Sequence, residues 1–423
     1  MYQLYHKYKR RDFTIPLVLL TLTNILGYFL WRLFSGQGIH QSDDSRWYLD
    51  YANALMTNFT VGLHMNDILY LGYNMLLTLL LAMFKDPIVV VFIQGVTASL
   101  SVILVYKIAC MLFNRTTAVI ASVFYCFMCD VALWSMYILS DSFFVSLLLL
   151  CVYFLLMALE CNQKKYKVLF IVTSLYMLVF RPTGIITMAV MLVYVLIRLD
   201  GNKVMDFAKK HRLFIGGFLT AVALGCIYIY TNHKLDPLIQ SLQSNVESIL
   251  YNVYAKGWIY DKSTAYDYFF SPDYSITINN SLILSFIINN WDHVSMIYLR
   301  RASAFLGTWV WETNLQNIFG ILSFAGNLLP TALFVTGTIA AIVNKQFRKA
   351  SILWLLILAV FAFCILLFID AMYRYRFPAM PFIAIVAAYG LERIISGGRI
   401  IAKKYMGMLL HAKRKNTDCN SGF

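Results

Sequence analysis

The residues whose types and spacing are best suited to chemistry lie between 41 and 51, in the stretch QSDDSRWYLDY. This stretch places the adjacent acids Asp43 and Asp44 directly after a first apolar run, 13–34. Charged side chains are costly in hydrocarbon and stable in water, so these acids are expected just outside a membrane. Carboxylates can take up protons, and arginines brought beside them can bind anions. The rest of the chain is interpreted as an apolar scaffold that surrounds this acidic loop and brings arginines to it.

The composition indicates a membrane protein. Hydrophobic residues make up 60% of the chain and charged residues 13%, whereas soluble domains are about a quarter charged. The first apolar run is long and has no small-residue cleavage site after it, so it is predicted to be a retained helix. An apolar helix of roughly 20 residues crosses a bilayer. The sequence therefore predicts an all-α polytopic membrane protein with about ten transmembrane helices: 14–34, 87–111, 117–134, 141–159, 167–180, 183–198, 213–230, 317–343, 350–369 and 377–395.

The distribution of charge predicts the orientation of these helices. With the N-terminus in the cytoplasm, 24 of the 35 Lys and Arg residues but only 6 of the 21 Asp and Glu residues fall on the cytoplasmic side. This is the positive-inside pattern of cell-membrane proteins, with both termini inside. A crossing by Ile68–Phe84 would reverse the pattern, so that helix is predicted to lie at the outer surface or to dip into the membrane without crossing it. The basic residues are split among short loops, which argues against a nucleic-acid partner and leaves membrane lipids as their partners.

The chain is predicted to form a single transmembrane domain with two outer segments. The first outer segment carries the acidic loop and two predicted surface helices, Arg46–Asn58 and Ile68–Phe84. The second is rich in aromatic residues, which is typical of an interfacial belt and also of a sugar-binding face. The predicted parts are a cytoplasmic lead, 1–13, the domain, 14–395, with outer segments 35–86 and 231–316, and a basic cytoplasmic tail, 396–423.

One turn within the domain is expected to expose an arginine to a cavity. The sequence Arg181-Pro-Thr-Gly184 divides the apolar run 167–198 into two halves. At 1.5 Å per residue, each half is shorter than the hydrocarbon core. The connecting turn should therefore lie beneath the outer surface, with Arg181 lining a cavity.

No cofactor is predicted. Cys126 and Cys129 form a C-x-x-C pair, but it lies inside a predicted membrane helix, where small apolar packing is the default interpretation. The outer histidines do not show metal-ligand spacing, and a divalent metal stays open only as an alternative. The chain contains no P-loop, Rossmann glycine fingerprint or HExxH motif.

A series of short motifs resembles one family in order and spacing. In the predicted topology all of them fall on the outer face. The motifs are Asp44-Ser-Arg-Trp-Tyr48, Ile68-Leu-Tyr-Leu-Gly-Tyr-Asn74, Tyr137-Ile-Leu-Ser-Asp-Ser-Phe-Phe144, Phe180-Arg-Pro-Thr-Gly184, Arg374-Tyr-Arg-Phe-Pro378 and Ala388-Tyr-Gly390. Together they resemble the GT-C membrane glycosyltransferases, in the branch of the dolichyl-phosphate-mannose protein mannosyltransferases and bacterial lipid-linked-sugar transferases.

The resemblance implies transfer of a sugar from a polyprenyl-phosphate donor to a glycan, lipid or protein acceptor by one inverting displacement. Asp44 would act as the general base, with Asp43 second. The donor phosphate would be bound by Arg181, Arg374 and Arg376, because arginine stays charged and binds oxygens in pairs. Further substrate contacts would come from Asp141, Tyr48 and Tyr373.

Other interpretations of these residues stay open at this point. The acids Asp43, Asp44 and Asp141 could instead cap helices, and Asp141 could hold an arginine. The arginines could extend toward lipid headgroups. A transporter or flippase for lipid-linked sugars would also be a multi-span protein, but its charges usually lie near the middle of the membrane. A glycan polymerase and a non-catalytic subunit are further alternatives, and the sequence does not identify the sugar, the acceptor or the polyprenyl chain.

Overall fold

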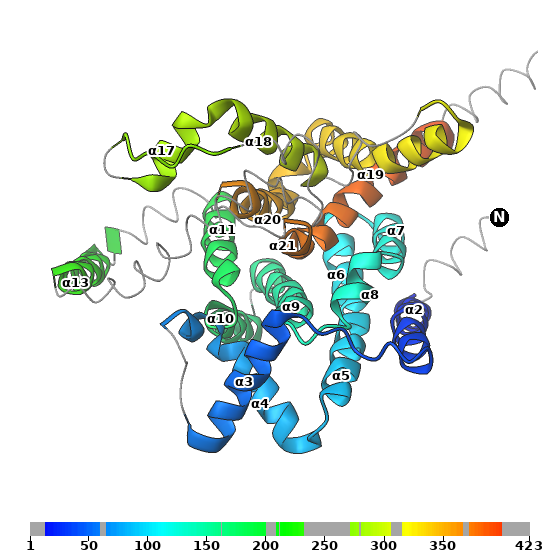
Figure 1. Cartoon of the computed structure of the whole chain (residues 1–423). Helices are drawn as coiled ribbons and strands as arrows, with labels where there is room; N and C mark the ends of the chain where they lie inside the picture. Colours follow the sequence, from blue (N-terminus) through cyan, green and yellow to red (C-terminus); the bar gives the residue numbers. More distant parts are fainter. Residues whose placement is uncertain are drawn as a thin grey trace, which may run out of the picture.

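The computed structural model describes residues 13–59, 65–161, 163–199, 209–210, 212–231, 271–278, 281–305, 315–366 and 372–399. These residues form helices joined by turns, and the pairing between His40 and Tyr137 in them is an isolated bridge rather than a strand (Figure 1). Within the described ranges, six helices are long and apolar enough to cross a membrane. The prediction of an all-α polytopic membrane protein is therefore confirmed.

The six long helices coincide with six of the ten predicted crossings. They are α2 (Thr14–Phe34), the pair α5 (Pro87–Leu100) and α6 (Val102–Leu112), α9 (Ser140–Cys161), α19 (Ile318–Val343), α20 (Phe347–Leu366) and the helix in Phe377–Arg399.

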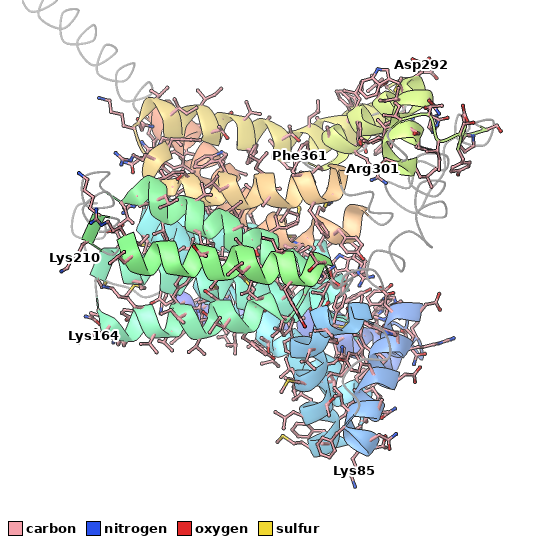
Figure 2. All side chains as sticks on the ribbon, turned by 90° about the vertical axis from the view of Figure 1, so that its left-hand side faces the viewer. Lys85, Lys164, Lys210, Asp292, Arg301 and Phe361 are labelled. Atoms are coloured by element: carbon pink, nitrogen blue, oxygen red, sulfur yellow. The ribbon has the colours of Figure 1, made fainter. Side chains whose placement is uncertain are left out.

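The other four predicted crossings also form helices. These are α7 (Arg115–Cys126) with α8 (Cys129–Trp134), α10 (Lys164–Leu178), α11 (Pro182–Arg198) and α13 (Arg212–Thr231). The number of crossings stays a prediction. Figure 2 shows Lys164 and Lys210 at the same end of the helices, as expected for two residues on one side of a membrane.

Helix α9 lies at the centre of the molecule, between α10 and α11 on one side and α5 and α6 on the other (Figure 1). Its residues are apolar around most of its circumference, and a helix of that kind is buried among others. Phe144, Leu148, Leu149 and Val152 are at most 1% exposed. The N-terminal end of this central helix carries Asp141, so the packing of α9 fixes where that carboxylate lies.

Two helices run across the direction of α9–α11 rather than along it (Figure 2). They are α3 (Asp43–Asn58) and α4 (Leu71–Phe84), which follows the short 3₁₀-helix η1 (Met65–Tyr70). These are the two helices predicted to lie at the outer surface, and that placement stays a prediction. The predicted start of the first one, at residue 46, is wrong, because Ser42 caps the helix by accepting from the backbone N–H of Ser45.

Helix α4 is fixed against the turn that precedes α11. The backbone N–H of Gly72 donates to the carbonyl of Val179 at 2.7 Å, and the hydroxyl of Tyr176 donates to the carbonyl of Gly72 at 2.8 Å. A Cβ at Gly72 would lie 3.0 Å from the carbonyl oxygen of Val179 and 3.1 Å from the backbone of Phe180, so a larger residue would push the two backbones apart by a few tenths of an ångström. This contact places the turn with Arg181 beside α3 and α4.

Candidate active site

Four charged side chains from four separate elements form a continuous chain of ion pairs. Asp44 lies in the first turn of α3, Asp141 lies in the first turn of α9, Arg181 precedes α11, and Arg374 lies in the short helix α21 (Met372–Tyr375). Arg374 Nη1 lies 2.5 Å from Asp44 Oδ2, and Arg374 Nη2 lies 3.0 Å from Asp141 Oδ2. Arg181 Nη1 pairs with Asp141 Oδ1. The order Asp44–Arg374–Asp141–Arg181 alternates in sign and sums to zero charge.

Asp141 is the centre of this chain of charges. Its side chain is 0% exposed and accepts from two guanidinium groups. Among the roles considered for Asp141, this geometry corresponds to binding arginines. A carboxylate so deep is stable only while paired, and removing one partner of a buried ion pair costs about 3–5 kcal/mol. Asp141 therefore fixes the positions of Arg181 and Arg374 relative to each other.

Arg374 contacts both carboxylates. Its Nε donates to Asp141 Oδ2 at 3.0 Å and its Nη1 to Asp44 Oδ2 at 2.5 Å. Burial alone would lower the pKa of Arg374, but the carboxylate of Asp141 raises it above its usual value. This guanidinium is therefore permanently charged, and its position between the two acids explains why α21 stays close to α3.

Of the four ion-paired side chains, that of Asp44 is the one open to solvent, with 50% of it exposed. The alternative that Asp43 and Asp44 cap the helix is wrong, because Ser42 is the N-cap and the two acids lie in the first turn. Acids in that position are favoured by the positive end of the helix dipole. Asp43 is exposed and makes no hydrogen bond or ion pair with the described residues. The structure thus distinguishes the two adjacent acids.

The remaining predicted site residues lie beside these four ion-paired side chains or outside the residues that the structure describes. Arg376 Nη2 lies 3.7 Å from Asp130 Oδ2, so this arginine pairs with an acid other than Asp44 or Asp141. Tyr48 is buried, and its hydroxyl lies 3.1 Å from that of Ser140, next to Asp141. Burial raises the pKa of Tyr48 well above its usual value, so it keeps its proton. The side chain of Tyr373 lies outside the described residues.

Three aromatic side chains at the site were missed by sequence reasoning. The ring of Tyr375 faces both site arginines, with its centroid 5.0 Å from Arg181 Cζ and 5.4 Å from Arg374 Cζ. Such contacts favour a cation over the face of the ring. Tyr70 and Tyr73 pack edge-on against Tyr48, with centroids 5.8 Å and 4.7 Å away. Tyr70 is the last residue of η1 and Tyr73 lies in the first turn of α4, and both stand in the motif 68–74, which was the available signal.

An apolar cavity of about 300 Å³ lies among α4, α5, α6, α9 and α10. Phe180, which precedes Arg181, and Phe143, which follows Asp141 by two residues, both line it. The other lining residues are Leu76, Thr97, Leu100, Ser101, Leu104, Ser146, Leu147, Leu150 and Tyr176. Arg181 was expected to line a cavity, but the residue that lines this one is its neighbour in sequence, Phe180.

Within the described residues, no three His, Cys, Asp or Glu side chains gather in a way that could hold a metal ion. The acids at the site are instead held by arginines.

Comparison with known proteins supports the resemblance found in the motifs. No curated protein matches the chain. Residues 71–228 match the family model described as dolichyl-phosphate-mannose-protein mannosyltransferase. The match includes Asp141 and Arg181, whereas Asp44 and Arg374 lie outside it. Over these residues the chain is similar to that mannosyltransferase family, and the match confirms the resemblance to the GT-C membrane glycosyltransferases.

Proposed function

We propose that this protein transfers a sugar from a polyprenyl-phosphate donor to a hydroxyl or amine acceptor on the outer face of the cell membrane. The observation that carries the proposal is the pairing of a half-exposed carboxylate, Asp44, with a guanidinium, Arg374. A base and a phosphate-binding cation are the two groups that such a displacement requires. The packing of α3, α9 and α21 brings this carboxylate and this guanidinium together, which supports the proposal.

In the proposed reaction the acceptor oxygen or nitrogen attacks the anomeric carbon of the sugar. The bond between that carbon and the phosphate oxygen breaks, and the configuration at the carbon inverts. Asp44 takes the acceptor proton, a role worth about 10²–10⁴-fold in rate. The departing polyprenyl phosphate gains a second negative charge, which Arg374 and Arg181 would stabilise, because arginine binds phosphate oxygens through a planar fork of N–H groups.

The apolar cavity supports a donor that is linked to a lipid. Its walls are formed mostly by Leu and Phe side chains, and one of them, Phe180, directly precedes Arg181 in the sequence. A polyprenyl chain in this cavity would carry its phosphate toward the arginines. A water-soluble nucleotide donor would gain nothing from such walls.

A transporter of lipid-linked sugars is the main competing function. Transporters usually carry their charged groups near the middle of the membrane. Here Asp44 and Asp141 lie in the first turns of their helices, and Arg181 immediately precedes its helix. The clustering of the charges at helix ends favours the enzyme.

Mass spectrometry of polyprenyl-phosphate sugars and envelope glycans, with and without the protein, tests the proposal. Cells that lack it should accumulate one donor and display a glycan, lipid or protein that has lost one sugar. Purified protein should then convert that donor in detergent micelles, where no membrane separates two sides. Failure to convert it there, combined with a block in cells, would favour the transporter.

A further inference from the structure

The ion pair between Asp44 and Arg374 connects the proposed base with the proposed phosphate site, and the inference drawn from it rests on the proposed function. Arg374 is bound at the same time by the proposed base, Asp44, and by the buried Asp141. We propose that the donor phosphate displaces Asp44 from Arg374, so that the base is released only once the donor is bound. Asp44 would then have two roles, as a base and as the group that occupies the phosphate site of the empty enzyme.

The division of Arg374 between its two partners determines which of them can leave. Nε and Nη2 both lie 3.0 Å from Oδ2 of Asp141, so this edge of the guanidinium is committed to the core. Among the described residues, Nη1 donates to Asp44. A phosphate oxygen that binds Arg374 end-on therefore meets Asp44 first.

The exposure of the two carboxylates also indicates that Asp44, rather than Asp141, leaves Arg374. The Asp44 side chain is 50% exposed, whereas that of Asp141 is 0% exposed. Water can solvate Asp44 as soon as it leaves, and exposed ion pairs contribute little to stability. Asp141 has no such compensation, because a buried charge that loses its partner is strongly unfavourable. Asp141 is thus a positioning residue that keeps Arg374 in place while Asp44 and the phosphate exchange.

The charges of the proposed reaction are consistent with a complete cycle. The donor is a phosphodiester with one negative charge, and it replaces the single negative charge of Asp44 at Arg374. On transfer, the acceptor proton goes to Asp44, which becomes neutral and cannot compete for Arg374. The leaving phosphate, now with a second charge, stays bound. Loss of the proton to water restores the Asp44 carboxylate, which returns to Arg374 and displaces the polyprenyl phosphate.

If this exchange occurs, the negative charge of residue 44 weakens the binding of the phosphate to Arg374. Undecaprenyl phosphate is a suitable probe, with its dissociation constant measured for the full chain in lipid nanodiscs. Asp44→Asn keeps the shape of the side chain but removes the competing charge, so the probe should bind more tightly, on the order of 3- to 10-fold. Asp50→Asn is the matched control, since Asp50 is an exposed acid on the same helix, and it should change binding by less than about 2-fold.

A third variant connects the effect to Arg374. In an Arg374→Gln background the probe should bind more weakly, and Asp44→Asn should then give no further gain, because the competition is for that guanidinium. A purely structural role for Asp44 predicts unchanged or weaker binding in Asp44→Asn. Thermal unfolding of each variant shows that the comparison is made between folded proteins, and Asp44→Ala provides a second removal of the charge.

The outcomes separate this inference from the proposed function. Binding that depends on Arg374 but is equally tight in the unmodified protein and in both Asp44 variants would overturn the exchange and leave the proposed function standing. The same conclusion follows if Asp50→Asn tightens binding as much as Asp44→Asn. No binding of the probe to the unmodified protein would overturn both.

Discussion

Replacing Asp141 by Asn should destabilise the protein strongly while changing only one atom of the side chain. Asp141 is fully buried, and its loss leaves the guanidinium of Arg181, 2% exposed, without its carboxylate. Removing one partner of a buried pair costs about 3–5 kcal/mol. The unfolding entropy of 423 residues is about 0.9 kcal/mol/K, so the melting temperature should fall by about 3–6 °C.

The matched control is an exposed ion pair in the same protein. Arg198 Nη2 and Glu160 Oε1 lie 2.6 Å apart, with side chains 22% and 40% exposed. Glu160→Gln should cost at most about 1 kcal/mol, and therefore shift the melting temperature by about 1 °C or less. Both variants can be compared by tryptophan fluorescence during heating in detergent. Equal shifts for the two would refute the assignment of Asp141 as a buried counter-charge.

A double variant tests the same reasoning from the other side. Asp141→Leu combined with Arg181→Met replaces this buried pair by apolar side chains, which is often neutral for stability. It should recover part of the melting temperature that Asp141→Asn loses, because Arg181 no longer needs a partner although Arg374 still loses its contact with residue 141. Sugar transfer should stay lost, because Arg181 is proposed to stabilise the departing phosphate. Recovery of transfer together with stability would show that these two residues serve the fold alone.

Three further predictions concern Arg374, the membrane topology and the apolar cavity. Arg374→Lys keeps the charge but cannot bridge two carboxylates through a planar fork, so transfer should fall at least about 10-fold; unchanged turnover would assign Arg374 to lipid anchoring. Cysteines at Lys164 and Lys85 should react with impermeant thiol reagents from opposite sides of the membrane, and labelling from one side would reject the ten-crossing topology. Ser146→Phe should fill the apolar cavity and raise KM for a long-chain donor, whereas Leu79→Phe, at an exposed position on α4, should not.

The fold was largely predictable because its signals are local. Apolar runs of membrane length gave helix positions that the structure reproduces within a few residues, as for 141–159 and α9 (Ser140–Cys161). The start of α3 was missed although Ser42 and two following acids form a recognisable helix start. The sequence contains a local signal for this helix start, but the predicted start was three residues too late.

The partners within the site were not predictable in the same way. Asp44 and Arg374 are 330 residues apart, and no pattern in the sequence specifies which acid meets which arginine. Arg376 has the same residue type and a position only two residues later, yet it pairs with Asp130. Tyr375 stands between two arginines in the motif 374–378, and only the structure shows its ring facing Arg181 and Arg374. Pairings of this kind depend on how α9, α11 and α21 pack.

Sugar transfer by purified Asp44→Asn shows whether Asp44 is the general base. Asn keeps the size of Asp, and Ser42 still caps the helix, so the variant should fold and insert normally. It cannot accept a proton, so transfer should fall at least about 100-fold, the low end for a missing general base. Asp43→Asn should lose much less. Full activity of Asp44→Asn beside an inactive Asp43→Asn would exchange the two assignments, and full activity of the double variant would contradict the acidic loop as the catalytic centre.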